Sequence, residues 1–298
     1  MAIHREIVMH TTRSQRWRDR RALWVPAASE IDPRRLAVDV IDSRKVAAPF
    51  VRAHHYAASM PVTRLSVGLF ADGAGGRPQL VGVCVFSHPV NDASVPKNAG
   101  LKNPRAACDL GRLVVLDCQG GNAESFLVAR AFRLLRREKP EILSVISYAD
   151  PVRRTDGQGR VFMPGHVGGL YAVMAARYVG RSSPRTDLLL PDGRPVSSRA
   201  LSKIRNAECG QRYAIDHLLR AGAPPPRHGE DRAAWLTGLE RTGFLRRRRH
   251  PGCHAYVFPL TRAARHAAAR VPDQPYPILD RSLTDGDVTA LPLLRRAA

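Results

Sequence analysis

The chain has 298 residues, enough to bury a full hydrophobic core, and its apolar fraction of 44% is ordinary for a globular protein. Its charge is unusual, because 47 lysines and arginines face only 26 aspartates and glutamates, which leaves a net charge of +21. A field of that size attracts polyanions, so we expect a nucleic acid as partner. The sequence has no long apolar run, no signal-peptide pattern and no CxxC pair among its five cysteines, which favours a cytoplasmic protein without a membrane span, disulfide framework or zinc ribbon.

Residues 1–30, an arginine-rich stretch with Trp17 and Trp24, are predicted to form a basic N-terminal arm. Its arginines would follow phosphates while the indole rings stack on bases. The same composition also suits a lightly docked terminus, and the sequence leaves this choice open.

The next predicted elements surround an aromatic motif. A strand over 34–40 is followed by Asp42, which we expect to cap a helical segment over 43–53. That segment ends in the motif HHY, residues 54–56. Alternating apolar residues then predict paired strands over 65–70 and 80–86, joined by a glycine-rich hairpin turn.

A polar loop over 88–107 and a strand over 110–116 lead to a predicted helix from Ala123 to Arg137. The helix has an apolar face, made by Leu127, Ala131, Leu134 and Leu135. Asn122 is predicted as its N-cap. Ser125 lies in the first turn, where backbone N–H groups and the helix dipole favour an anion.

The stretch from 142 to 180 carries most of the candidate chemistry. Its apolar start predicts a buried strand, and Asp150 then lies at the strand's C-terminal end, where open α/β sheets bind ligands. Tyr148 precedes it in the motif SYAD, and His166 and Tyr171 follow in GHVGGLY. A helix is predicted over 170–178, with Tyr171 and Tyr178 on one face. Plainer interpretations stay open, since Asp150 can cap the loop and a helical tyrosine often packs in the core.

The chain beyond Gly180 is strongly basic. We expect a strand over 186–190, helices over 198–220 and 232–241, and a hairpin over 244–260. One arm of that hairpin carries four consecutive basic side chains: Arg246, Arg247, Arg248 and Arg249. Residues 241–270 contain no acid, which favours phosphate contacts over a solvated face. Arg153 and Arg154, in the insert before His166, are further candidates for DNA contacts.

Four local sequences stand together in chain order: HHY at 54–56, DLGRLVV at 109–115, NAESF at 122–126, and SYAD with GHVGGLY between 147 and 171. This combination resembles the Mom-type DNA modification enzymes of bacteriophages. The resemblance implies an α/β fold, a GNAT-like mixed sheet flanked by helices. It also implies a transferase that adds a carbamoylmethyl-type group to the N6 amine of adenine in DNA and so protects phage or prophage DNA from restriction. The catalytic domain would cover 31–262, with a helical insertion at 198–241, basic additions at both ends and a tail over 263–298.

The resemblance places functional residues at Tyr56, Arg112, Ser125 and Asp150, with His55, His166 and Tyr171 as neighbours. Adenine N6 is a poor nucleophile because its lone pair is delocalised into the ring, so a nearby base would help. We assign that role to Asp150, assisted by Tyr148 or His166. Tyr56 or Tyr171 would stack on a base held out of the duplex.

The expected partners are double-stranded DNA and a small-molecule group donor. Ser125, Arg112 and Asn122 are the expected donor-binding residues, since a helix N-terminus and a guanidinium both hold anionic or carbonyl groups. The donor stays open, because the loop before the helix lacks the glycine spacing with which GNAT enzymes bind the pyrophosphate of acyl-CoA. Iron is a further candidate, with His55 and Asp150 as ligands and Tyr56 beside them.

Each assignment has an alternative. Arg112 can form an ion pair with Asp109 or Asp117, and Ser125 can be a capping residue only. Two other functions also remain: a GNAT acyltransferase that acts on a small molecule or protein, and a DNA-binding protein without catalysis.

Overall fold

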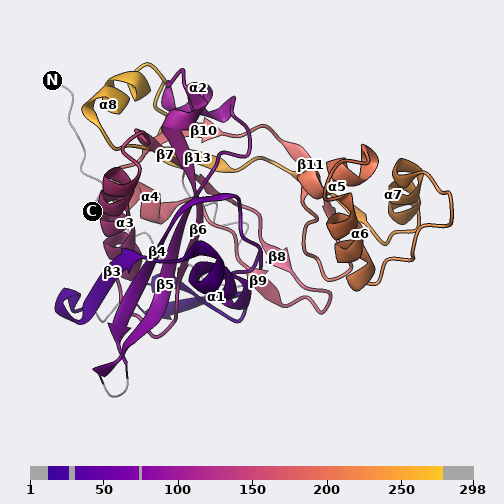
Figure 1. The fold of residues 1–298 in the computed structure, drawn as a ribbon, viewed down its shortest axis with the longest axis horizontal. Coiled ribbons are helices and arrows are strands. Elements are labelled where there is room, and N and C mark those ends of the chain that lie inside the picture. The colour runs from indigo at the N-terminus through magenta and orange to yellow at the C-terminus, as the bar shows by residue number, and fades with distance from the viewer. Residues whose placement is uncertain (1–12, 27–30, 74–75, 278–298) are drawn as a thin grey trace, which may run out of the picture. The chain divides into compact units, whose positions relative to one another are not determined.

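Contacts within the chain divide it into two compact units, drawn in Figure 1. The computed structural model describes residues 13–26, 31–73 and 76–277. The first unit takes the described residues up to Pro151, then Pro164–Arg181 and the described residues from Cys253 on. The second unit consists of Val152–Met163 and Ser182–Gly252. The remaining residues of the predicted N-terminal arm and C-terminal tail lie outside the described residues.

A seven-stranded sheet is the centre of the first unit, in the order β10-β13-β7-β6-β5-β4-β3. Its strands are β3 (Leu36–Val40), β4 (Thr63–Asp72), β5 (Pro78–Ser87), β6 (Ala107–Val115), β7 (Ser144–Ala149), β10 (Arg177–Arg181) and β13 (His254–Pro259). Neighbouring strands are antiparallel except for the parallel pair β6 and β7, so the sheet is mixed. The predicted α/β class with a mixed sheet is confirmed.

Helices cover both faces of this sheet (Figure 1). The first unit contains α1 (Ala48–His54), α2 (Ser94–Ala99), α3 (Ala123–Glu138), α4 (Gly169–Val173) and α8 (Arg262–Ala268). Leu127, Ala131 and Leu135 of α3 are fully buried in the largest hydrophobic cluster, as the helical spacing predicts. Val83, Val85 and Val114, which alternate with residues of that cluster, pack against α1 on the opposite face.

The parallel pair β6 and β7 opens soon after it begins. The strands pair at Ala107, Cys108 and Asp109 with Ser144, Val145 and Ile146, although β6 continues to Val115 and β7 to Ala149. A β-bulge follows on β6, because Val85 and Phe86 of β5 face Arg112 and Leu110 and leave Gly111 between them. A bulge turns the next side chain toward the other face, so Arg112 lies on the same side of the sheet as α1.

The described part of the predicted N-terminal arm forms a hairpin of β1 (Arg13–Arg18) and β2 (Arg21–Pro26). Asp19 and Arg20 form its turn with φ angles of 48° and 63°. These are the two positive φ values that a two-residue hairpin turn of this kind needs.

The second unit has a core of its own, which includes Leu201, Ile204, Leu218, Trp235 and Leu236. Its helices are α5 (Ser198–Arg205), α6 (Gln211–Arg220) and α7 (Arg232–Arg241). Its strands form two small antiparallel pairs, β8 (Arg154–Thr155) with β9 (Val161–Met163) and β11 (Arg185–Leu189) with β12 (Arg246–His250). The helical insertion predicted over 198–241 falls inside this unit.

Several local predictions were wrong. Residues 88–107 are not all loop, because they include α2 and a 3-10 turn at Pro104–Ala106. The helix expected over 170–178 ends at Val173, and Tyr178 lies in β10, because Ala175 takes a φ of 55° that stops the helix. The hairpin expected over 244–260 does not form, because β12 pairs with β11 while β13 pairs with β7 and β10. The helix expected over 198–220 is broken into α5 and α6 near Ala207 and Gly210, both with positive φ.

Candidate functional site

The segment after α1 brings aromatic side chains to Arg112. His55 is 8% exposed, and its ring lies 4.5 Å from that of Tyr56. Arg112 donates from Nε to the carbonyl oxygen of Ser59 (3.0 Å) and from Nη2 to the Ser59 hydroxyl (3.1 Å). It also donates to the carbonyl oxygen of Gly111 in the bulge (2.6 Å). The hydrogen bonds of Arg112 therefore go to Ser59 and Gly111. Asp117 pairs with Arg18 instead, so the expected alternative of an ion pair between Arg112 and Asp109 or Asp117 is wrong.

Burial, helped by nearby positive charge, favours the neutral form of His55. Burial, followed by the Arg112 guanidinium and His166, holds the pKa of His55 well below 6.5. Burial also lowers the pKa of Arg112, while Tyr56 acts in the opposite direction. Nδ1 of His55 accepts the backbone N–H of Ala57 (3.1 Å), so Nε2 is the nitrogen left to bind a proton or a ligand. An iron site with His55 as a ligand stays a prediction, and Nε2 would be the ligating atom.

Asp150 follows β7 directly, as the sequence predicts, and its backbone carbonyl accepts the N–H of His166 (2.8 Å). Burial lowers the pKa of His166, and the Asp150 charge opposes that shift, so the two side chains interact. The ring of His166 lies 6.4 Å from that of Tyr171. The loop from 150 to 171 therefore closes on itself and holds a carboxylate, an imidazole and a phenol together.

Tyr171 links this loop to the α1 segment. Burial raises its pKa, with smaller contributions from Cys84, Tyr56 and Cys253. Its ring packs 5.2 Å from that of Tyr256 and 6.0 Å from that of Phe258, so it is a core residue as well as a neighbour of Tyr56. The structure thus gathers six predicted residues into one cluster: His55, Tyr56, Arg112, Asp150, His166 and Tyr171. We call these six residues the β6–β7 cluster, since Arg112 comes from β6 and Asp150 follows β7 at the end where the two strands separate.

Tyr148 lies on a different side of β7, with the residues that pack near α2. Its hydroxyl accepts a hydrogen bond from Asn98 Nδ2 (3.2 Å), and burial raises its pKa to about 12. Asp109 contributes to that shift, and its own pKa is raised to about 7 by burial. A phenol with a pKa of about 12 is a weak proton carrier near neutral pH, which favours His166 over Tyr148 as the partner of Asp150.

Ser125 and Asn122 line a hollow of about 480 Å³ at the start of α3, together with Ile31, Pro33, Phe126, Ala129 and Met174. Asn122 is the N-cap residue of α3, as predicted, and its backbone carbonyl accepts the N–H of Phe126 (2.9 Å). It has a φ of 67°, and its side chain makes no capping hydrogen bond. The Ser125 hydroxyl donates to the carbonyl oxygen of Asn122 (2.9 Å). These two predicted donor-binding residues therefore share a surface beside α3.

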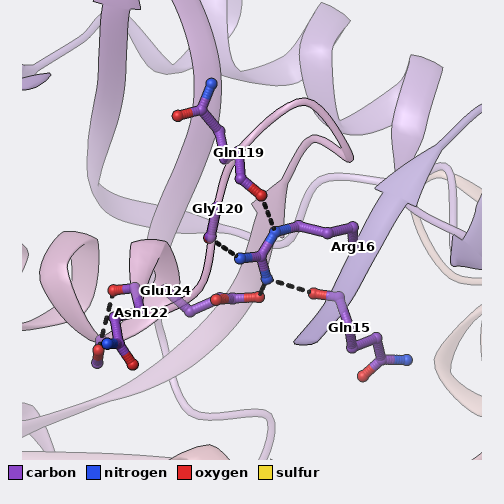
Figure 2. Close-up of polar contacts among 7 residues, drawn as sticks. Gln15, Arg16, Gln119, Gly120, Asn122 and Glu124 are labelled. Atoms are coloured by element: carbon purple, nitrogen blue, oxygen red, sulfur yellow. Dashed lines mark hydrogen bonds and ion pairs between the residues drawn. The ribbon is translucent and has the colours of Figure 1, made fainter. Parts of the chain in front are cut away.

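The loop before α3 holds a side chain that the sequence did not assign to it. Figure 2 shows Arg16 of β1 directed at the carbonyl oxygens of Gln119 and Gly120 and at the carboxylate of Glu124. Arg16 and Ser59 have roles here that sequence reasoning missed, because both depend on partners far away in the chain.

The predicted DNA-binding arginines belong to the second unit. Arg246, Arg247 and Arg249 of β12 are exposed, although Arg247 also pairs with Glu240 (3.1 Å). Arg248 is half-buried and donates to the carbonyl oxygen of Arg153 (2.8 Å). Arg154 is only 2% exposed and forms an ion pair with Asp187 (3.7 Å). Arg154 is therefore enclosed within this unit, and its prediction as a phosphate contact is wrong.

No helix in the described residues is long and apolar enough to cross a membrane. A comparison with curated proteins found no match. A comparison with protein families matched residues 35–278 to the Mom protein family, and that range contains the whole β6–β7 cluster and all three donor-binding candidates, Ser125, Arg112 and Asn122. Since the match extends over most of the sequence, the chain belongs to the Mom protein family.

Proposed function

We propose that this protein modifies adenine in phage or prophage DNA at the N6 amine, with a group of the carbamoylmethyl type, and so protects the DNA from restriction. One observation carries the proposal. Residues that the Mom resemblance assigns to the reaction come from separate parts of the chain, and His55, Tyr56, Arg112, Asp150, His166 and Tyr171 meet in one cluster. Membership of the Mom family supports DNA modification as the general activity.

Asp150 is the base in the proposed reaction. The N6 amine attacks a carbon of the donor, a new N–C bond forms, and the bond from that carbon to its leaving group breaks. The N6 proton moves to the Asp150 carboxylate, and the leaving group takes the electron pair. His166 is the next proton acceptor, because its imidazole interacts with the Asp150 charge and burial lowers the pKa of that imidazole, which favours its neutral form.

Arg112 and the aromatic rings supply binding and orientation. The guanidinium of Arg112 is aimed by Ser59 and Gly111, so it presents a fixed positive charge to a carboxylate or phosphate of the donor or DNA. Tyr56 is half-buried beside His55 and offers a flat surface on which an extruded adenine stacks. The extruded base then lies near Arg112, in the cluster that also contains Asp150.

Two rivals make different predictions. A DNA-binding protein without catalysis is favoured by the exposed arginines of β12, and it predicts that Asp150 has no effect on DNA chemistry. An acyltransferase that acts on small molecules needs a donor site at the start of α3. There, Arg16 occupies the carbonyl oxygens of the loop, and calorimetry with acetyl-CoA tests whether a donor still binds.

The experiment is mass spectrometry of nucleosides from DNA of cells that express the protein. The intact protein should produce a heavier adenosine, and its mass identifies the added group. Asp150→Asn keeps the size of the side chain and should abolish that species while DNA affinity is retained. Asp39→Asn, at an exposed carboxylate of β3, is the matched control and should behave as the intact protein does. Unmodified DNA from cells expressing the intact protein, with DNA binding unimpaired, would favour the non-catalytic rival.

A further inference from the structure

The β1–β2 hairpin precedes the residues that match the Mom family, yet it contacts two segments of the candidate site. Arg16 and Trp17 are neighbours on β1, and successive side chains of a strand point to opposite faces. Arg16 reaches the loop before α3, and Trp17 reaches the segment after α1. One dipeptide therefore connects the segment that carries Ser125 with the segment that carries Tyr56.

Arg16 is fully buried, and its guanidinium donates hydrogen bonds to four oxygen atoms (Figure 2). Nε donates to the carbonyl oxygen of Gln119 (3.1 Å), and Nη2 donates to that of Gly120. Nη1 donates to the carbonyl oxygen of Gln15 (2.9 Å) and to the carboxylate of Glu124. Glu124 directly precedes Ser125 in the first turn of α3. Arg16 thus fixes the loop and the helix start that place Ser125.

Trp17 stacks on both rings of the motif that follows α1. Its ring lies 5.0 Å from that of His55 and 5.5 Å from that of Tyr56, at interplanar angles of 30° and 26°. The hairpin turn holds the same segment, because Arg20 donates from its backbone N–H to the carbonyl oxygen of His54 (3.0 Å) and from Nε to that of Arg52 (3.1 Å). A backbone bridge between Trp17 and Leu116 attaches β1 to the residue that directly follows β6.

The segment after α1 needs such a support. The helix ends at His54, and Tyr56 lies in an irregular turn in which Ala58 has a φ of 48°. Regular backbone hydrogen bonds therefore do not set the direction of the Tyr56 ring. The stacked ring of Trp17 sets the direction of the Tyr56 ring instead, because aromatic rings in stacked contact restrict each other's orientation.

We propose that Arg16 and Trp17 are positioning residues for DNA modification, with Trp17 orienting Tyr56 and His55 and Arg16 fixing the start of α3 at Ser125. The proposal rests on the proposed function for its consequence in catalysis, although the stacking itself does not depend on the reaction. Neither residue contacts the reacting atoms. The flat ring of Trp17 is the feature that matters, so another aromatic side chain should replace it and an aliphatic one should not.

The test compares Trp17→Phe, which keeps a flat ring, with Trp17→Leu and Trp17→Met, which fill the space without one. The first readout is the ring-proton signal and titration of His55 by NMR in the full chain with labelled histidine, assigned through His55→Asn. Stacking shifts this signal, and we expect the shift to persist with Phe and to vanish with Leu and Met. Arg21→Ala, at an exposed position on the same hairpin, is the control and should change nothing.

The second readout is the fraction of modified adenine in cellular DNA, at matched protein level, thermal stability and DNA affinity. We expect Trp17→Phe to stay near the intact protein and the two aliphatic variants to fall roughly 10- to 100-fold, the loss that a small misplacement of a binding group causes. Leu and Met variants that modify DNA as well as Phe would overturn the proposal, whatever their NMR signals. If one aliphatic variant does not fold, the other decides.

The two proposals fail in distinguishable ways. If the intact protein leaves adenine unmodified, the proposed function fails. The NMR signal of His55 alone then tests whether Trp17 orients the segment after α1. In that case, an unchanged His55 signal in the Leu and Met variants overturns the positioning proposal as well. If the Leu and Met variants lose the stacking shift of His55 but modify adenine normally, only the positioning proposal is overturned.

Discussion

Replacement of Arg16 by methionine tests the structure of the hairpin contact most directly. Methionine fills much of the same volume but offers no donor, so Glu124 and the carbonyl oxygens of Gln119 and Gly120 each lose a charged partner. Burial already raises the pKa of Glu124 above 4.5 although Arg16 opposes the shift. The carboxylate left behind is therefore unfavourable in its ionised form.

The expected cost follows from the burial of the pair. Removal of one partner of a buried ion pair destabilises proteins by about 3–5 kcal/mol, because the other charge stays buried without compensation. Glu124 keeps 16% of its side-chain exposure, which places the expected value near the lower end, at about 3 kcal/mol. The double variant Arg16→Met with Glu124→Met removes the stranded charge too, so it should be less destabilised than Arg16→Met alone.

The pH dependence has a defined sign. An acid whose pKa is raised in the folded state binds its proton more tightly there, so stability falls as pH rises from 4.5 through the folded pKa. Loss of Arg16 raises the pKa of Glu124 further and widens this window. The deficit of the Arg16→Met variant should therefore be larger at pH 8 than at pH 5.

Hydrogen exchange measured by mass spectrometry reports this effect locally, in peptides that cover 13–26 and 119–126 of the full chain. A loss of about 3 kcal/mol corresponds to opening that is on the order of 100-fold more frequent. Arg21→Met is the control, since Arg21 is exposed on the same hairpin. The reasoning is refuted if Arg16→Met leaves exchange unchanged, or if the double variant exchanges as fast as the single one.

Three further predictions concern other parts of the chain. Gly168→Ala should lower the melting temperature and reduce the proposed adenine modification, because Gly168 has a φ of 89° and a Cβ there would lie 2.6 Å from the Tyr256 ring. Gly169→Ala has open space around it and should behave as the intact protein does in the same thermal melts and nucleoside analysis. Burial, followed by Arg181 and His166, lowers the pKa of His254 from 6.5 to about 4. The stability of the protein should therefore fall as pH drops from 6.5 to 4, and the melting temperature of His254→Gln should decline less over the same pH range. Arg246→Gln and Arg249→Gln should each weaken DNA binding uniformly across sequences and reduce the slope of log affinity against log salt by about 1, whereas unchanged slopes would remove β12 from the DNA surface.

Local patterns predicted much of the first unit. The spacing of Leu127, Ala131 and Leu135 identified α3, and alternation identified β4 and β5 with the turn between them. These elements are set by residues close together in sequence. The failures depend on distant partners: β13 joins β7 and β10 instead of β12, and no local pattern specifies that choice. Tyr178 has helical spacing from Tyr171, but the turn at Ala175 takes it into a strand.

The candidate site was predictable where residue types and order carried information. Asp150 was placed after its strand from the apolar run before it, and the HHY motif was placed at the end of a helical segment. The sequence indicated Arg16 and Trp17 only as parts of a basic arm, in which arginines would follow phosphates and indole rings would stack on nucleic-acid bases. Their partners lie about a hundred residues away for Arg16 and about forty for Trp17, so nothing nearby in the sequence indicates that they face inward.

Arginine has two different uses in this chain, and the distinction limits what its net charge proves. Arg16 and Arg154 are buried, and Arg112 is half-buried with its donors directed at Ser59 and Gly111. Their charges count toward +21, but two of the three have no access to a phosphate. Guanidinium groups suit both uses, since several fixed donors can satisfy backbone carbonyls as well as they bind phosphate. The case for a DNA partner therefore depends on the exposed arginines such as Arg246 and Arg249, and on a cluster in which Arg112 and Asp150 are held next to aromatic rings.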